Sequence, residues 1–284
     1  DGDAIHFNIS NSIDMIYVYL AKKNGVTIRI AHSHNSFAKS RSRKITHFAL
    51  KPFLSNMPSH YMACSEKAAK WSFSKKITKA KKYYMIKNAI ETKRYLYNPV
   101  VRNTVRDKFG ISDKVIFGHV GRFNTQKNHK FLIDIFNEIQ KVESRAILIL
   151  IGEGELRSEV EEYVDKKNLI EKVRFLGAVS NVEEWLQAMD VMILPSLYEG
   201  LPFVLVESQA ASLPAIVSDT ITDEVKISEY VQYESLESEE TKWAKKAIAL
   251  SNFERKTNYE AMLKSGFDIS SMISNLTDIY DEII

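Results

Sequence analysis

The stretch of sequence that decides the fold runs from Val191 to Asp219 and reads VMILPSLYEGLPFVLVESQAASLPAIVSD. Its apolar runs VMIL and PAIV enclose a polar loop and a segment with the spacing of a helix. Strands this continuously apolar are buried on both faces, which is typical of a parallel sheet with helices on each side. The stretch therefore predicts a strand, a loop, a helix and a second parallel strand.

The same alternation extends over the whole chain. Helical segments separate further short apolar runs, which read AIHFNI, TIRIAH, YMACS, YYMIKNA, VIFGHVG, AILILIG and VRFLG. One of these helical segments, HKFLIDIFNEIQKV, places Phe131, Ile135 and Ile139 on one face. The pattern predicts the α/β class, with a doubly wound parallel sheet formed twice.

The composition excludes several classes of protein. With 284 residues, 45% of them hydrophobic and 26% charged, the chain is long enough for two globular domains and too apolar for a disordered one. Its single cysteine, Cys64, cannot form an internal disulfide. We see neither a secretory leader nor an apolar run long enough to span a bilayer. These features predict a cytoplasmic protein.

Positive charge is concentrated in the first third of the chain. From Lys39 to Arg94 there are 15 Lys or Arg residues against Glu66 and Glu91, a local balance of +13 in a chain whose net charge is +3. One interpretation is an electropositive face for anionic lipid headgroups or a lipid-diphosphate acceptor. The other is a solvated, lysine-rich helix surface. Nucleic acid is not expected as a partner, because aromatic residues do not alternate with these lysines as in a base-stacking sheet.

A domain junction is expected within MIKNAIETKRYLYNP, near residues 88–98. We predict a partial first domain at residues 1–93, a nucleotide-binding second domain at 94–265, and a terminal helix at 266–284. The first domain offers roughly four strands, fewer than a complete Rossmann-like unit. We therefore expect that the sequence begins inside a longer protein whose first βα units are missing.

Two cations follow the strand VIFGHVG. The chain turns at Gly121, and Arg122 and Lys127 then lie in the loop before the next helix. Ligands bind at this carboxyl edge of an open parallel sheet, and a pair of cations beside a helix N-terminus suits a diphosphate. The alternative is that both side chains are simply solvated.

Two glutamates flank the apolar segment of the opening stretch. Glu199 lies in the loop before the expected helix, and Glu207 about one turn inside it. Paired hydroxyls of a sugar suit a carboxylate acceptor, so one glutamate can hold a sugar ring and the other a ribose. Gly200 permits an unusual backbone angle and Pro202 suits the first helical turn. Free amides are expected at the start of the helix, at Phe203, Val204 and Leu205.

His32 and His34 follow a strand in RIAHSHNSF, and spacing by two places both imidazoles on one side of it. A zinc site is not expected, because no third ligand stands nearby. We expect instead a polar contact to a ligand in the cleft between the domains.

These residues together resemble the retaining, metal-independent GT-B glycosyltransferases of family 4, which build bacterial capsular polysaccharides, exopolysaccharides, teichoic acids and mannosides. The resemblance covers nearly the whole chain and rests on HVGRFNTQKN, ILIGEGELR, IAHSHNS and the block from Val173 to Asp219. It implies two Rossmann-like doubly wound parallel-sheet domains that face a cleft, the first of them incomplete.

The resemblance also assigns roles. Arg122 and Lys127 would bind the donor diphosphate, Glu199 the donor sugar and Glu207 the ribose diol, while His32 would lie over the anomeric face. The implied catalytic residues are His32, Arg122, Lys127 and Glu199. The implied donor-binding residues are Gly121, Arg122, Lys127, Glu199, Gly200, Leu201, Phe203, Val204, Leu205 and Glu207. No metal and no cofactor is implied.

The implied activity is transfer of a hexose or N-acetylhexosamine, with retention, from a nucleotide diphosphate sugar carrying UDP to a glycan or lipid-linked acceptor. It would serve bacterial surface polysaccharide biosynthesis at the cytoplasmic face of the membrane. The alternative is a non-catalytic, nucleotide-sugar-binding partner subunit of the same fold. The sequence departs from the family pattern at Ser212, where many members have glycine, and it shows no glycine-rich loop after a first strand. Its end, DISSMISNLTDIYDEII, resembles the last helix that crosses back to the first domain.

Overall fold

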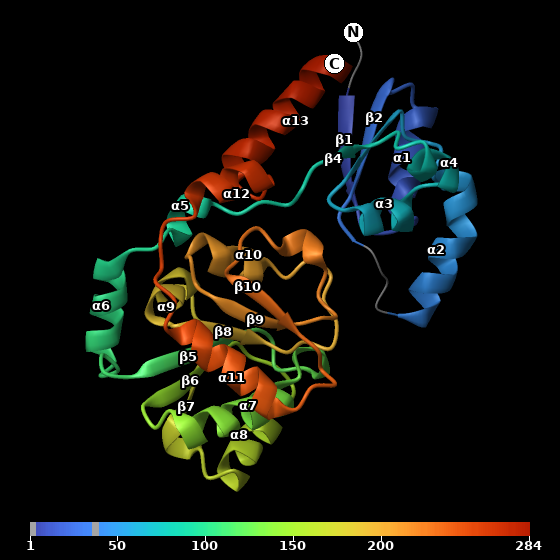
Figure 1. The fold of residues 1–284 in the computed structure, drawn as a ribbon. Coiled ribbons are helices and arrows are strands. Elements are labelled where there is room, and N and C mark those ends of the chain that lie inside the picture. Colours follow the sequence, from blue (N-terminus) through green and yellow to red (C-terminus); the bar gives the residue numbers. More distant parts are fainter. Residues whose placement is uncertain (1–3, 36–39) are drawn as a thin grey trace. The chain divides into compact units, whose positions relative to one another are not determined.

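The structure is a computed structural model that describes residues 4–35 and 40–284. It divides into two compact units, one formed by residues 1–89 together with 266–284 and one by residues 90–265 (Figure 1). Each unit contains a parallel sheet, which confirms the predicted α/β class. The domain boundaries at residues 93/94 and 265/266 stay predictions.

The larger unit is built on a six-stranded parallel sheet with the order β10-β9-β8-β5-β6-β7. Its strands are β5 (Val115–Val120), β6 (Ala146–Ile151), β7 (Val173–Gly177), β8 (Val191–Leu194), β9 (Ala215–Ser218) and β10 (Val231–Glu234). Along the chain, β6 and β7 are added to one side of β5. The chain then crosses back, and β8, β9 and β10 are added to the other side of β5. The strand order therefore reverses between β5 and β8. A doubly wound sheet binds its ligand at such a switch point.

Sequence analysis did not find the edge strand β10. Its four residues read VQYE, with Gln232 exposed and Tyr233 half-buried. An edge strand needs no continuous apolar run, because it is less covered than the strands at the centre of the sheet.

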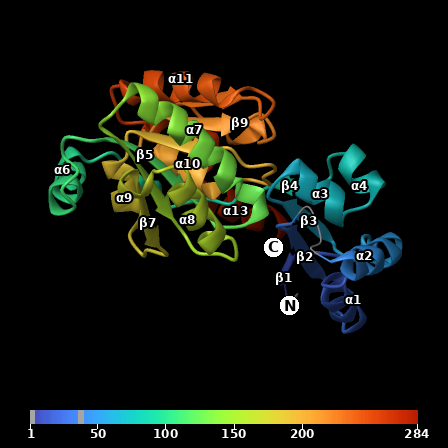
Figure 2. The same ribbon diagram turned by 90° about the horizontal axis from the view of Figure 1, so that it is seen from below.

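Helices cover both faces of the six-stranded sheet (Figure 1). One face carries α7 (His129–Val142), α8 (Arg157–Lys166) and α11 (Glu240–Ser251), and α7 and α11 pack against each other (Figure 2). The largest buried apolar cluster lies on this face and includes Phe117, Leu148, Ile193 and Trp243. The other helices of this unit are α5 (Thr92–Tyr95), α6 (Pro99–Lys108), α9 (Val182–Ala188), α10 (Phe203–Ala210) and α12 (Tyr259–Ser265).

The smaller unit has a four-stranded parallel sheet in the order β1-β2-β3-β4. Its strands are β1 (Ala4–Ile9), β2 (Ile28–Ser33), β3 (His60–Ala63) and β4 (Tyr84–Met85). Its helices are α1 (Met15–Lys23), α2 (Arg41–Leu54), α3 (Glu66–Ser72), α4 (Lys75–Lys79) and α13 (Ile269–Ile283). One buried cluster joins a face of the sheet to α1 and α3, and a second joins the other face to apolar residues of α13. Helix α13 thus packs its partly buried apolar side chains against the core of this unit.

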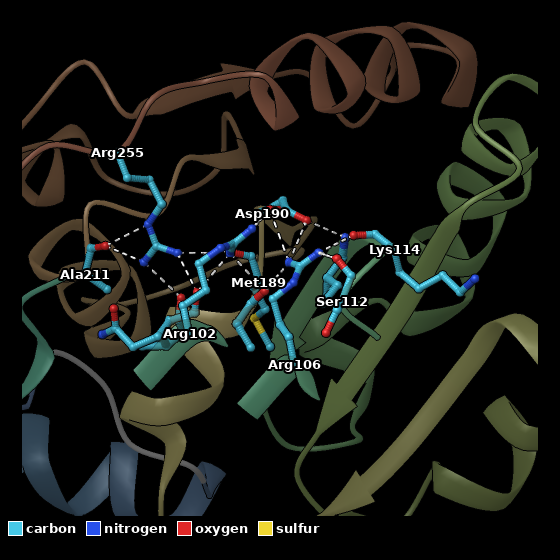
Figure 3. Close-up of polar contacts among 12 residues, drawn as sticks. Arg102, Arg106, Ser112, Lys114, Met189, Asp190, Ala211 and Arg255 are labelled. Atoms are coloured by element: carbon cyan, nitrogen blue, oxygen red, sulfur yellow. Dashed lines mark hydrogen bonds and ion pairs between the residues drawn. The ribbon is translucent and has the colours of Figure 1, made fainter. Parts of the chain in front are cut away.

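Three arginines of the larger unit surround the end of α9, namely Arg102, Arg106 and Arg255 (Figure 3). Arg102 donates from Nη1 to the carbonyl oxygens of Gln187, Ala188 and Met189, each at 3.0 Å, and its Nη2 pairs with Asp190. The last carbonyls of a helix have no intrahelical partner and carry the negative end of its dipole. The guanidinium therefore satisfies both the hydrogen bonds and the charge of the helix end.

Arg255 completes the same cluster from the segment before α12 (Figure 3). Its guanidinium donates to the carbonyl oxygens of Leu186 at 3.0 Å, Met189 at 3.1 Å and Ala211 at 3.1 Å. Burial and the neighbouring Arg102 lower the pKa of Arg255 to about 9, which leaves it charged at neutral pH. The segment before β8 and the end of α10 are fixed by one side chain.

The second residue after α10 has a backbone conformation that side chains disfavour. Ser212 has φ of 51°, in the left-handed region, and Leu213 N donates to Ser208 O at 2.8 Å across the end of the helix. Glycine is the usual residue at such a helix end because it has no Cβ to clash. This geometry explains why the family pattern has glycine where this chain has Ser212.

We expect Arg255→Met to lower the free energy of unfolding by about 3 kcal/mol or more, because each buried acceptor left unpaired costs about 1–3 kcal/mol. Arg255→Lys should recover only part of the loss, since an ammonium cannot reach all these carbonyls. Urea denaturation of both variants measures the effect. Lys256→Met is the control, because Lys256 is exposed and pairs only with exposed Glu254. A loss in Arg255→Met no larger than in the control would contradict this account.

Candidate functional site

Two loops meet at the carboxyl edge of the six-stranded sheet, where the strand order reverses. One follows β5 and includes residues 121–128, and the other follows β8 and includes residues 195–202. They are joined through the backbone, because Leu197 N donates to Gln126 O at 2.8 Å. The loop after β6 is joined to the first in the same way, with Phe123 N donating to Glu153 O at 3.0 Å. Backbone bonds thus hold all three loops at one edge.

Glu199 and Lys127 form an ion pair across this switch point. Lys127 Nζ donates to Glu199 Oε1 at 2.6 Å, and the side chains are only 14% and 8% exposed. Gln126 Nε2 donates to the other carboxylate oxygen, Oε2, at 2.9 Å. The structure therefore brings together two of the residues that the sequence predicts for the site and adds a third, Gln126.

Local features of the loop explain how Lys127 reaches Glu199. Asn124 Oδ1 accepts from Lys127 N at 3.2 Å and so caps the 3₁₀ turn Thr125–Lys127. A Cβ on Gly121 would lie 2.9 Å from Lys127 Cε and 2.9 Å from His119 Nε2. A side chain at this position would therefore displace the stem of Lys127 or the ring of His119, and glycine leaves both in place.

The histidines beneath this loop are neutral at physiological pH. Burial, together with His129 and Lys127, keeps the pKa of His119 well below its usual range. Burial and Lys127 likewise lower the pKa of His129 to about 4. His119 Nδ1 donates to Ile193 O at 2.9 Å, which ties the strand of one loop to the strand of the other. Near neutral pH these rings add no positive charge to that of Lys127.

Arg122 does not join the Lys127–Glu199 pair. Its side chain is 68% exposed, and Nη2 lies 3.1 Å from Glu155 Oε2. The next residue, Phe123, is buried, so the backbone turns Arg122 outward. Its role as a diphosphate ligand stays a prediction.

The N-terminus of α10 follows the loop that carries Glu199. Pro202 immediately precedes the helix, and no hydrogen-bond acceptor is found for the amides of Phe203 and Val204 in the parts of the chain that the structure describes. The expectation of a free amide is wrong for Leu205, which donates to Pro202 O at 2.9 Å. The amide of Leu205 is therefore already bonded within the tight turn that begins at Pro202.

Gly200 and Leu201 complete the loop before α10. Gly200 does not use the unusual backbone angle that glycine permits, because it is not among the glycines with positive φ. A Cβ on Gly200 would meet no atom within 4 Å. Leu201 is half-buried. At neither position do contacts within the protein explain the residue type.

Glu207 lies on α10 and contacts α5. Tyr95 donates its phenol hydrogen to Glu207 Oε1 at 3.1 Å. Burial raises the pKa of Glu207, and the bond from Tyr95 acts in the opposite direction. Burial and the nearby Glu207 raise the pKa of Tyr95 to about 12, so the phenol remains a donor.

His32 and His34 lie in the smaller unit. As predicted, they lie on the same side of the chain, with ring centroids 4.1 Å apart, and His6 of β1 adds a third ring 5.3 Å from His32. Burial, His34 and His6 lower the pKa of His32 to about 3. His34 is held by Asn8 Oδ1 at 2.9 Å and Asn88 Oδ1 at 3.1 Å. His32 is therefore a neutral side chain, able to form hydrogen bonds but not to carry charge near pH 7. Ser36, which ends the motif IAHSHNS, lies outside the described residues.

Within residues 4–35 and 40–284, no group of three or more His, Cys, Asp or Glu side chains is arranged to hold a metal ion. A pocket of about 300 Å³ lies beside the predicted loop and is lined by Asn124, His129, Leu156 and Leu197 among others. A larger pocket of about 500 Å³ lies between α6 and α9, and none of the predicted site residues lines it.

Residues 101–259 match the family described as Glycosyl transferases group 1, and the chain belongs to this family. EpsF of Bacillus subtilis (strain 168), named as a glycosyltransferase, is 33% identical over 270 residues, which cover 92% of this chain and 70% of EpsF. A shorter match of 107 residues, 33% identical, is to UDP-Gal:alpha-D-GlcNAc-diphosphoundecaprenol alpha-1,3-galactosyltransferase of Escherichia coli, covering 37% of this chain and 28% of that enzyme.

A solved structure with a similar fold is that of Anabaena Alr3699/HepE in complex with UDP. The TM-score is 0.78, with 14% sequence identity, and the alignment covers 98% of this chain and 78% of that one. This likeness confirms the predicted GT-B fold class, and at this identity it shows the fold alone.

Sequence analysis did not single out Gln126, Tyr95 or His6. Gln126 lies within the quoted motif HVGRFNTQKN, beside Lys127, so its position was a usable signal. His6 lies two residues before Asn8 on a strand, where spacing by two indicates a shared face. Tyr95 meets Glu207 only through the fold, and no local pattern indicates that contact.

We expect Tyr95→Phe to raise the pKa of Glu207 further, because the variant removes a hydrogen bond that stabilises the ionised carboxylate. A carboxyl with a raised pKa in the folded state contributes stability at low pH, and this contribution is lost as pH rises through that pKa. The variant should therefore lose more stability relative to wild type at about pH 7 than at about pH 4. Carboxyl ¹³C NMR titration and urea unfolding measure the two effects. Tyr163→Phe is the control, because Tyr163 bonds to Asp134. An unchanged or lower pKa of Glu207 would exclude the proposed bond.

Proposed function

We propose that the protein is a retaining, metal-independent glycosyltransferase that transfers a hexose or N-acetylhexosamine from a UDP-sugar to a glycan or lipid-linked acceptor. The observation that carries the proposal is the meeting of Lys127 and Glu199 at the switch point of the larger unit, at 2.6 Å. The name of the Escherichia coli relative supports a UDP-sugar donor and a lipid-diphosphate acceptor, and the UDP complex of HepE supports the nucleotide. Retention and metal independence enter through the resemblance to family 4.

In this proposal the diphosphate lies over the start of α10. The amides of Phe203 and Val204 point toward it with the positive end of the helix dipole, and Lys127 and Arg122 supply full charges. These groups offset the negative charge that grows on the diphosphate as the sugar leaves. The cation of Lys127 becomes available only when its pair with Glu199 opens.

The two glutamates would hold the sugars at either end of the diphosphate. Glu199 accepts hydrogen bonds from hydroxyls of the transferred sugar, and Glu207 from the ribose diol. His32, neutral because of its low pKa, contacts the donor sugar and is not a base. The leaving phosphate takes the proton of the acceptor hydroxyl on the same face, which preserves the anomeric configuration.

We expect Lys127→Met and Glu199→Gln each to lower UDP release from UDP-sugars by at least about 100-fold, because each removes a group that acts on the reacting donor. The assay uses the full-length protein, a panel of UDP-sugars and a lipid-linked acceptor. Lys130→Met is the matched control, since Lys130 is exposed and pairs with Glu159 at the surface. Full rates in the two site variants would refute the assignment. Binding of UDP-sugars without any turnover would favour the alternative, a non-catalytic partner subunit.

We also propose that the protein works at the cytoplasmic face of an anionic membrane and contacts it through α2. Among the described residues, no helix has both the length and the apolar character to cross a bilayer, so contact would be peripheral. Helix α2 exposes three large apolar side chains, Ile45 at 64%, Phe48 at 52% and Phe53 at 72%. Such a helix with cations beside its apolar side chains is typical of one that lies in a membrane interface.

The positive charge on α2 favours anionic lipid over neutral lipid as the binding partner of this helix. Arg41, Arg43 and Lys44 are exposed on the helix, and the described part of the chain has no acidic side chain from Met15 to Ser65. An anionic lipid surface attracts each such cation by about 1 kcal/mol. The first residue of the basic run, Lys39, lies outside the described residues.

The protein should sediment with vesicles containing phosphatidylglycerol at low salt, and high salt should release it. Replacing both Phe48 and Phe53 by Ser should weaken retention by about tenfold, since each phenylalanine contributes apolar area to the contact. Ile170→Ser is the control, as an exposed apolar residue of the larger unit. Equal binding to neutral vesicles, or salt-sensitive binding to RNA instead of lipid, would contradict this proposal.

A further inference from the structure

Gln126 contacts the loop of Glu199 through both its backbone and its side chain. Its carbonyl oxygen accepts from Leu197 N at 2.8 Å, and its Nε2 donates to Glu199 Oε2 at 2.9 Å. Lys127, the next residue, bonds to the other oxygen, Oε1. The carboxylate is therefore held from two sides by consecutive residues of one loop.

The two partners of Glu199 differ in charge. The side chain of Glu199 is 8% exposed, so its carboxylate depends on protein donors in place of water. If Lys127 turns to a bound diphosphate, Glu199 loses its cation while it remains largely buried. The amide of Gln126 is neutral, so a diphosphate does not compete for it as it does for an ammonium.

We propose that Gln126 is a positioning residue for Glu199. It holds Oε2 in place while Oε1 exchanges the ammonium of Lys127 for a hydroxyl of the donor sugar. The inference rests on the proposed function, because it assumes that Glu199 binds the sugar of the donor. It adds a source of discrimination, because Gln126 contributes more to the binding of donors that carry a sugar than to the binding of the bare nucleotide diphosphate.

Titration calorimetry measures the effect of Gln126 on the binding of UDP-sugars and of UDP separately, and it needs no acceptor. UDP, UDP-glucose, UDP-galactose and UDP-N-acetylglucosamine are titrated into the full-length protein, and the UDP-sugar with the tightest binding is kept. Gln126→Met preserves the length of the side chain and removes the donor. We expect it to weaken binding of that UDP-sugar by about tenfold, as loss of a hydrogen bond to a charged group does. Binding of UDP should weaken less than binding of that UDP-sugar.

Two further variants make the result decisive. Thr125→Val is the control, because Thr125 is an exposed neighbour in the same loop. Glu199→Gln tests the proposed function itself. If Glu199→Gln weakens UDP-sugar binding and Gln126→Met does not, the inference fails and the proposed function stands. If neither does, or if the wild type does not distinguish any UDP-sugar from UDP, the role assigned to Glu199 fails as well.

A purely structural role for Gln126 gives a different result. Loosening of the loop would weaken binding of UDP and of the UDP-sugar by the same factor. That outcome would also overturn the inference.

Discussion

The ion pair between Lys127 and Glu199 is the interaction on which the organisation of this site depends. Removing both charges from water is costly, and such a pair rarely stabilises a fold more than apolar side chains would. The pair instead fixes the position of two loops. It joins the loops that follow β5 and β8, the two strands between which the order of the sheet reverses. Gly121 leaves space for the lysine, and Gln126 adds the second bond to the carboxylate. The chain thus keeps opposite charges together at the place where a doubly wound sheet binds its ligands.

A rigid support stands behind that pair. The four central strands of the larger unit, β5, β6, β8 and β9, are almost fully buried, and three arginines fix the end of α9 directly before β8 begins. Cations placed at carbonyl groups need no carboxylate partner for each charge, because the helix end supplies part of the negative potential. The core and the arginine cluster at the end of α9 therefore set the position of the Glu199 loop. The charge of Lys127 acts only on Glu199 and on a ligand bound beside it.

Sequence patterns predicted the strands at the centre of both sheets, because continuous apolar runs report burial on two faces. They missed β10, whose edge position requires no such run. They placed Lys127 and Glu199 at the same edge of the sheet, since both follow parallel strands. They did not indicate that Arg122 turns outward or that Leu205 donates to Pro202, because these depend on the path of the backbone. Contacts between distant segments, such as that of Tyr95 with Glu207, have no local signature.

The left-handed backbone at Ser212 has a consequence for how this protein tolerates substitution. A side chain in that conformation costs on the order of 1 kcal/mol relative to glycine. Other interactions of the larger unit offset this cost, directly beyond the helix that carries Glu207. A scaffold that sustains one such position can accept other substitutions of similar cost, which lets a family vary its sequence while it keeps its architecture.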